Sequence, residues 1–101
     1  MRILERVIQQ VRPGKWAELE AIDKKFTAVE SRYGFPPKRR YQCLAGGYTT
    51  NTLIIEREWE CLAVMEAAYE KDLADPEVQA LNAEVLSIVE SNRFELYLVL
   101  P

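Results

Sequence analysis

Three side chains near the middle of the chain could form a small binding site. Arg57 and Trp59 are two positions apart in a strand predicted over residues 52–60, so both point to the same face. Tyr41 lies in a second predicted strand, residues 38–45, and shares that face if the two strands pair as a hairpin. A guanidinium fork, an indole surface and a phenol hydroxyl suit a planar ligand that is anionic or phenolic. The alternative interpretation is structural, with both aromatic side chains in the core and Arg57 paired with a glutamate.

A strand predicted over residues 2–12 carries further polar candidates. Arg6, Gln9 and Gln10 lie inside it, and polar groups buried in a sheet need partners. They would line either a ligand cleft or an interface between two subunits. Because both faces of the strand carry a glutamine, alternation does not decide between these two places. Gln9 therefore joins Tyr41, Arg57 and Trp59 as a candidate ligand-binding residue, and no residue is assigned a catalytic role.

Two runs of charged residues have structural explanations. Glu56, Glu58 and Glu60 recur at every second position, which would suit a cation site or an acid–base cluster. No calcium-binding loop accompanies them, so we interpret them as a solvated or salt-bridged face of a strand. The basic residues 38–40 are divided between two faces by alternation and form too small a surface for nucleic acid. We therefore predict no metal site and no nucleic-acid partner.

The composition excludes several classes of protein. The chain has 101 residues, of which 49% are hydrophobic and 29% charged, and a net charge of −3, as in an ordinary soluble domain. It contains no histidine, which removes the commonest general base, metal ligand and haem ligand. Cys43 and Cys61 would not face each other in the hairpin, so two free thiols are expected. With neither a membrane-length apolar run nor a signal peptide, we expect a cytoplasmic protein without a membrane partner.

The spacing of apolar residues predicts the element order β-α-β-β-α-β. After the first strand, helical spacing predicts a helix over residues 16–33, ended by Gly34. The second helical region follows the third strand directly and is broken near Asp75, where Asp-Pro-Glu is a favourable helix start. A turn at residues 92–93 leads into a last strand, residues 94–100. The order predicts a ferredoxin-like α+β sandwich.

This sandwich would be a single domain, residues 1–101, with a four-stranded antiparallel sheet and two helical regions on one face. We place the more apolar face of the hairpin beneath the helices, and on the other face expect pairs such as Arg40 with Glu58. The last strand is apolar at nearly every position, which is typical of burial on both faces. A symmetric homodimer that packs sheet against sheet would bury the open face.

Several motifs give the chain a family resemblance. They are Glu5-Arg6, residues 12–15 (Arg-Pro-Gly-Lys), residues 58–61 (Glu-Trp-Glu-Cys), residues 75–79 (Asp-Pro-Glu-Val-Gln) and residues 94–97 (Phe-Glu-Leu-Tyr). With them, the chain resembles the dimeric α+β barrel superfamily over nearly its whole length. Within that superfamily it resembles the NIPSNAP-like small proteins, and more distantly the antibiotic-biosynthesis monooxygenase group.

The resemblance implies a ligand cleft between sheet and helices, lined by Trp59 and Arg57. It implies a small organic ligand and a cofactor-independent monooxygenase-like activity, in which the protein supplies shape and a few polar groups, so no cofactor is expected. The alternative is a non-enzymatic homodimeric interaction or scaffold module whose cleft is filled by its own side chains. Haem binding is also open to this fold, but the chain lacks the usual histidine ligand. Relatives often carry serine where Cys61 stands, so a poor helix cap is expected there.

Overall fold

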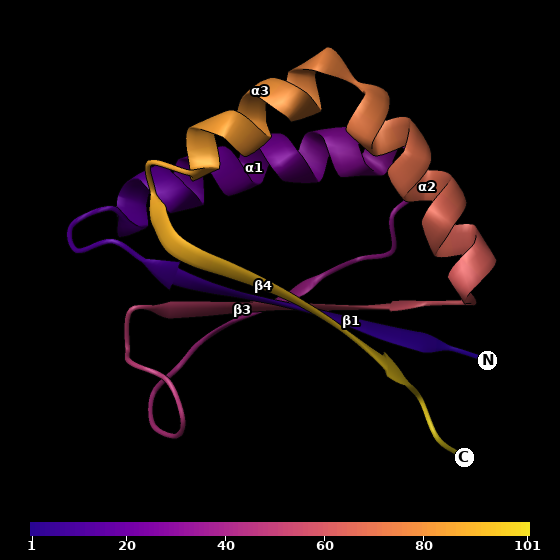
Figure 1. Cartoon of the computed structure of the whole chain (residues 1–101), viewed down its shortest axis with the longest axis horizontal. Coiled ribbons are helices and arrows are strands. Elements are labelled where there is room, and N and C mark those ends of the chain that lie inside the picture. The colour runs from indigo at the N-terminus through magenta and orange to yellow at the C-terminus, as the bar shows by residue number, and fades with distance from the viewer.

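The computed structural model describes residues 1–101 as a sheet with helices on one side only (Figure 1). In chain order the elements are β1 (Ile3–Val11), α1 (Trp16–Arg32), β2 (Arg39–Gln42), β3 (Thr52–Trp59), α2 (Leu62–Ala74), α3 (Pro76–Val85) and β4 (Val89–Leu98). All neighbouring strands are antiparallel, in the order β2-β3-β1-β4. The predicted ferredoxin-like α+β fold is confirmed.

Helix α1 ends at the predicted glycine. The backbone N–H groups of Tyr33 and Phe35 both bond to the Glu30 carbonyl, and that of Gly34 reaches the Ser31 carbonyl. Gly34 has a φ of 74°, in the left-handed region that glycine adopts without steric cost. The chain therefore turns sharply here, and the segment that follows carries Phe35 back toward the sheet.

Asp75 separates α2 from α3, as predicted. Its carboxylate accepts a hydrogen bond of 2.8 Å from the Glu77 N–H, and Pro76 occupies the first position of α3. The Tyr33 hydroxyl donates a second hydrogen bond of 2.6 Å to the same carboxylate. This bond is the main reason why the pKa of Asp75 lies below its usual value. Cys61, by contrast, stands at the start of α2 without any side-chain cap bond.

Two strand boundaries differ from the prediction. Strand β2 spans only Arg39–Gln42, because residues 43–51 form a wide loop on the side of the sheet away from the helices (Figure 1). Strand β4 begins at Val89, and the expected turn at residues 92–93 lies inside it. Since β1 is long enough to pair along the whole of β4, these polar residues are held in the sheet, with one register shift near Gln10.

The predicted face of β2 was wrong. Tyr41 pairs with Ile54 and therefore points to the face without helices, whereas Arg40 pairs with Ile55 and points toward α1. Arg40 forms ion pairs with α1 rather than with Glu58: its Nη2 lies 2.6 Å from Glu20 Oε1. The register follows from the wide hairpin loop, and the acidic residues of α1 attract the basic positions of this edge strand.

The core lies between the sheet and the helices. Its larger cluster joins both helical regions to the sheet through residues such as Leu19, Leu53 and Val78, and a smaller cluster surrounds Trp59. Strand β4 is an edge strand, so the expected burial on both of its faces does not occur within one chain: Leu98 is 56% exposed. None of the helices has the length and apolar character needed to cross a membrane.

The face without helices carries the glutamates of β3, as predicted. Arg6 Nε lies 2.6 Å from Glu56 Oε2, and Glu58 stands 3.9 Å from Arg2. The interpretation of Glu56 and Glu58 as a salt-bridged strand face is confirmed, whereas Glu60 lies just beyond the end of β3 and is exposed. Cys43 and Cys61 are both free thiols.

Candidate functional site

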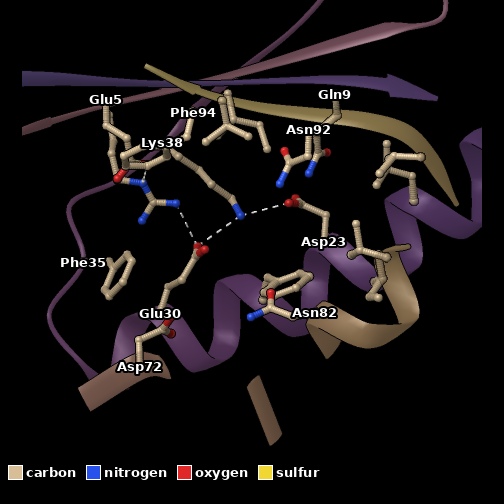
Figure 2. A pocket seen from close by; sticks show the side chains of 18 of the residues that line it. Glu5, Gln9, Asp23, Glu30, Phe35, Lys38, Asp72, Asn82, Asn92 and Phe94 are labelled. Atoms are coloured by element: carbon tan, nitrogen blue, oxygen red, sulfur yellow. Dashed lines mark hydrogen bonds and ion pairs between the residues drawn. The ribbon is translucent and has the colours of Figure 1, made fainter. Parts of the chain in front are cut away.

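A cavity of about 380 Å³ lies between the helix-covered face of the sheet and the helices (Figure 2). Small-molecule sites commonly have volumes of about 300–1,000 Å³. Most of the cavity wall is apolar, with aromatic side chains such as Phe26, Phe35 and Phe94. The polar and ionisable residues that line it are Glu5, Gln9, Asp23, Glu30, Lys38, Arg57, Tyr69, Asp72, Asn82 and Asn92. The cavity thus combines an apolar wall with a concentrated set of polar groups.

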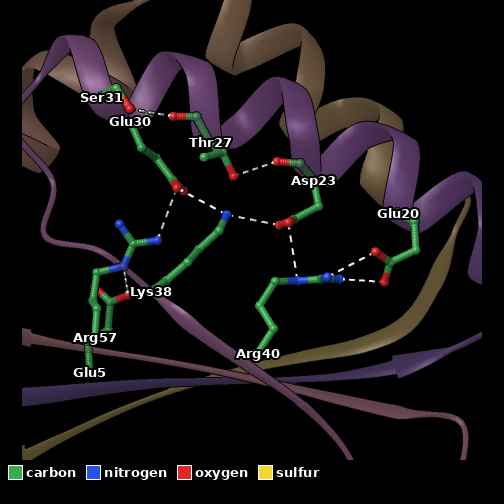
Figure 3. Close-up of polar contacts among 9 residues, drawn as sticks. All are labelled: Glu5, Glu20, Asp23, Thr27, Glu30, Ser31, Lys38, Arg40 and Arg57. Carbon is green, nitrogen blue, oxygen red and sulfur yellow. Dashed lines mark hydrogen bonds and ion pairs between the residues drawn. The ribbon is translucent and has the colours of Figure 1, made fainter.

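A chain of ion pairs joins α1 to the sheet along one side of the cavity (Figure 3). Glu30 accepts from Arg57 Nη2 at 3.1 Å and from Lys38 Nζ at 3.1 Å. Lys38 Nζ also reaches Asp23 at 2.9 Å, and the other oxygen of Asp23 lies 3.1 Å from Arg40 Nε. Asp23 and Glu30 are two turns apart on one face of α1, so both meet the sheet.

Glu5 is the most buried charged group of the site, with only 1% of its surface exposed. Its Oε1 accepts hydrogen bonds from the Trp59 indole N–H at 3.1 Å and from the Tyr69 hydroxyl. Its Oε2 lies 3.3 Å from Arg57 Nε, which makes an ion pair. Burial, and next the charge of Glu5, raise the pKa of Tyr69, so the phenol stays protonated and donates. Through these three side chains, two elements, β3 and α2, are held to β1.

Aromatic rings pack around this group. Phe35 meets Trp59 edge-on with ring centroids 5.0 Å apart, and meets Tyr69 in the same way at 4.9 Å. On its other side Tyr69 meets Phe94, with centroids 6.1 Å apart. The Arg57 guanidinium lies over the Phe35 ring, 4.9 Å from its centroid. The cavity therefore has an aromatic wall next to its most buried charges.

Three buried polar atoms at the cavity have no hydrogen-bond partner. One is Arg57 Nε, which still lies 3.3 Å from Glu5 Oε2 in an ion pair. The other two, Arg57 Nη1 and Gln9 Oε1, have no partner of either kind and belong to residues that are only 5% and 9% exposed. A buried polar group without a partner costs about 1–3 kcal/mol. Since both residues line an open volume, a ligand or a bound water could satisfy them without any movement of the chain.

Asp72 is the one carboxylate of the cavity wall that makes no hydrogen bond or ion pair through its side chain. It lies on α2, is 7% exposed and faces the cavity beside Glu30 (Figure 2). Burial is the main reason why its pKa rises to about 6, and the negative charge of Glu30 adds to the effect. The Arg57 charge opposes this rise. Asp72 therefore changes its charge near neutral pH.

The structure brings together some of the residues predicted from the sequence. Arg57 and Gln9 both line the cavity. Trp59 lies behind the wall, fully buried, and reaches the site through its hydrogen bond to Glu5. Tyr41 lies on the opposite face of the sheet, is 45% exposed and does not line this cavity.

Sequence reasoning missed Glu5 and Asp72. Both stand at positions whose neighbours on the same face are apolar. Glu5 falls between Ile3 and Val7 on the inward face of β1, and Asp72 continues a buried stripe on α2 that includes Ala68. A carboxylate on an otherwise apolar face was the signal that could have identified each of them.

No protein-family model matches this sequence, and no curated protein matches it either. Solved structures do match its fold. A NIPSNAP family protein from Agrobacterium tumefaciens has a TM-score of 0.81 at 19% identity, covering 98% of this chain and 86% of that one. An uncharacterized NIPSNAP domain protein from Burkholderia xenovorans has a TM-score of 0.82 at 18% identity, covering 97% and 94%. SnoaB, a cofactor-independent oxygenase from Streptomyces nogalater, has a TM-score of 0.72 at 16% identity, covering 99% and 94%. The chain shares the fold of these proteins.

Proposed function

We propose that this chain, which has the fold of NIPSNAP family proteins and of SnoaB, binds a small organic ligand in the cavity between its sheet and its helices. The observation that carries the proposal is the pair of unpartnered buried atoms, Arg57 Nη1 and Gln9 Oε1, on the wall of an open volume. A domain that folds without a ligand usually pairs such atoms within its own core. Here both are left for a molecule that enters the cavity.

The two atoms define what such a ligand must offer. Arg57 Nη1 can only donate, so it needs an oxygen or nitrogen acceptor on the ligand. Gln9 Oε1 can only accept, so it needs an O–H or N–H donor. The alternative function, a scaffold module with a filled cleft, predicts no cavity at this place, and the volume of about 380 Å³ argues against it.

The finer proposal is a cofactor-independent monooxygenase-like activity. It is supported by the fold shared with SnoaB, which is a cofactor-independent oxygenase. It is also compatible with a site that has no histidine, since in such chemistry the substrate supplies the electrons. Oxygen uptake, measured with each compound that binds, would separate turnover from binding alone.

Changing either of the two cavity residues should weaken ligand binding without unfolding the protein. We expect a thermal-shift screen of flavins, quinones, phenolic acids, amines and acyl-thioesters to yield at least one stabilising compound. A compound present at 100 times its Kd stabilises by about 2.7 kcal/mol. Arg57→Lys keeps the charge near Glu5 and Glu30 but removes Nη1, and Gln9→Leu removes the acceptor, so each should weaken binding at least about tenfold.

Tyr41→Phe is the matched control for these variants, because Tyr41 lies on the other face of the sheet. It should leave the affinity unchanged. A compound whose affinity survives Arg57→Lys and Gln9→Leu would bind elsewhere. A screen in which no class of compound stabilises the protein would favour the scaffold function.

We also propose that two copies pair through the face without helices, sheet against sheet. Apolar side chains stand on that face, among them Tyr97, which is 42% exposed. The charges beside it already have partners, since Arg6 is bonded to Glu56 and lies over the Tyr97 ring, 5.1 Å from its centroid. These charges can therefore be covered at less cost than isolated ones.

Introducing a charge at Tyr97 should separate the two copies. We expect sedimentation equilibrium to give twice the mass of one chain for the natural protein and the mass of a single chain for Tyr97→Glu. Leu86→Glu places the same charge on an exposed side chain at the end of α3 and should leave the dimer intact. A natural protein that sediments as one chain would contradict the proposal.

A further inference from the structure

The cavity wall carries an excess of negative charge. Its basic side chains are Lys38 and Arg57, and its acidic side chains are Glu5, Asp23, Glu30 and Asp72. Arg40 also reaches Asp23, but it is paired with Glu20 at the same time and does not alter the balance. An anionic ligand would therefore enter a region of negative potential, and a cationic ligand would neutralise it.

Asp72 is the one carboxylate of this wall without a cation beside it. The other three carboxylates share two cations: Glu5 contacts Arg57, Glu30 contacts Arg57 and Lys38, and Asp23 contacts Lys38. Asp72 is as deeply buried as the core residues around it, at 7% exposure, and has no partner. A buried carboxylate is normally paired with a cation or hydrogen-bonded, whereas the oxygens of this one remain accessible at the cavity wall and have no partner in the protein.

The side chains next to Asp72 are suited to an organic cation. Tyr69 stands one turn earlier on α2, and its ring packs against Phe35 and Phe94, all three on the cavity wall. Aromatic faces attract cations within about 6 Å of the ring centroid. The Arg57 guanidinium already uses Phe35 in this way, at 4.9 Å. A carboxylate beside aromatic rings on the wall of a cavity is a suitable environment for an ammonium group.

We propose that the cavity binds an organic amine, with its ammonium group against the Asp72 carboxylate and its apolar body along the aromatic wall. This inference rests on the proposed ligand-binding function and names the ligand class. It replaces the anionic or phenolic ligand suggested by the sequence, because Glu5 and Glu30 already neutralise Arg57. Arg57 Nη1 and Gln9 Oε1 are left for polar groups at other positions of the amine.

The charge state of Asp72 determines whether amine affinity should rise or fall with pH. The ionisable groups around it are Glu5 on β1, Glu30 on α1, Tyr33 at the end of α1, Arg57 on β3 and Asp75 between α2 and α3. Together with burial they place the pKa of Asp72 at about 6. An ammonium group prefers the ionised carboxylate, so amine affinity should rise as the pH increases through this value. A carboxylate ligand should show the opposite trend.

Isothermal titration calorimetry with three matched probes tests this inference. Phenethylamine is a cation, phenethyl alcohol is neutral and hydrocinnamate is an anion, and all three have similar shapes. Each is titrated at pH about 5 and about 8, where aliphatic ammonium groups stay protonated. The proteins are the natural chain, Asp72→Asn, and Glu70→Gln, which removes an exposed carboxylate of α2 outside the cavity.

We expect phenethylamine to bind more tightly than the other two probes, and about tenfold more tightly at the higher pH. Asp72→Asn should lower its affinity at that pH at least about tenfold and remove the pH dependence, whereas Glu70→Gln should preserve both. Preferred binding of hydrocinnamate or phenethyl alcohol, binding of none of the probes, or an amine affinity that survives Asp72→Asn would overturn the inference. The broader proposal would still stand if another class of compound bound and depended on Arg57 and Gln9.

Discussion

Replacing Glu5 with alanine is expected to lower the free energy of unfolding by about 3–5 kcal/mol, because it leaves the Arg57 charge buried with Glu30 as its only counter-ion. The substitution also removes the acceptor for the Trp59 indole and the Tyr69 hydroxyl, both of which are bonded to Glu5 Oε1. Domains of this size are stable by about 5–15 kcal/mol, so the loss would be a large part of the total. Urea unfolding, followed by tryptophan fluorescence, measures it.

Two comparison variants assign this loss to its cause. Glu5→Gln keeps the size and one acceptor oxygen but removes the charge, so its stability should lie between those of the natural protein and Glu5→Ala. Glu58→Ala removes a glutamate whose side chain is 47% exposed and 3.9 Å from Arg2, and should change stability by less than about 1 kcal/mol. If Glu5→Ala were no more damaging than Glu58→Ala, the buried ion pairs would not be what holds α2 and β3 to β1.

Most of the fold could be predicted because its signals are local. Gly34 ends α1 through a backbone conformation that favours glycine, and Asp75 starts α3 through a bond to an N–H two residues away. The alternation in β3 was also sufficient to place Arg57 on the inner face. Each of these features depends on a few neighbouring residues, which a single sequence displays.

The errors arose where structure depends on distant partners. The face of β2 is set by its register against β3, which a wide hairpin loop leaves open, so Tyr41 and Arg40 were assigned to the wrong sides. The role of Glu5 depends on Trp59 and Tyr69, which are 54 and 64 positions away in the sequence. Asp72 was not predicted as a site residue because an acidic residue on a helix is usually solvated. Its place on the buried stripe of α2 was the one local signal, and its lack of a partner cannot be read from local spacing.

The two acidic residues, Glu5 and Asp72, have opposite effects on the stability of the fold. Glu5 has three partners and contributes to stability, whereas Asp72 has none and opposes folding whenever it is ionised. A native domain that keeps an uncompensated buried charge sacrifices stability at that position, and binding sites are where such losses are usually found. The loss of stability caused by Asp72 can be measured without knowledge of any ligand.

Asp72→Asn is expected to stabilise the free protein at pH about 8 by up to about 3 kcal/mol and to leave its stability unchanged at pH about 2.5. The folded protein raises the pKa of this carboxyl from 3.8 to about 6, so folding favours the neutral acid. Above the folded pKa the natural protein bears the full cost of the buried charge, about 1.4 kcal/mol for each unit of the shift. Below 3.8 the carboxyl is neutral in both states and the cost disappears. The amide is neutral at every pH and has nearly the same shape as the carboxylate.

The measurement is the difference in unfolding free energy between the natural protein and the variant, taken from urea titrations across this pH range. The difference isolates Asp72, because carboxyls whose pKa is lowered, such as Asp75, act in the opposite direction and cancel between the two proteins. Glu70→Gln should show no comparable gain at any pH. A variant that is less stable than the natural protein at high pH would mean that Asp72 has a stabilising partner in solution, and an ammonium group would then have no vacant carboxylate to occupy.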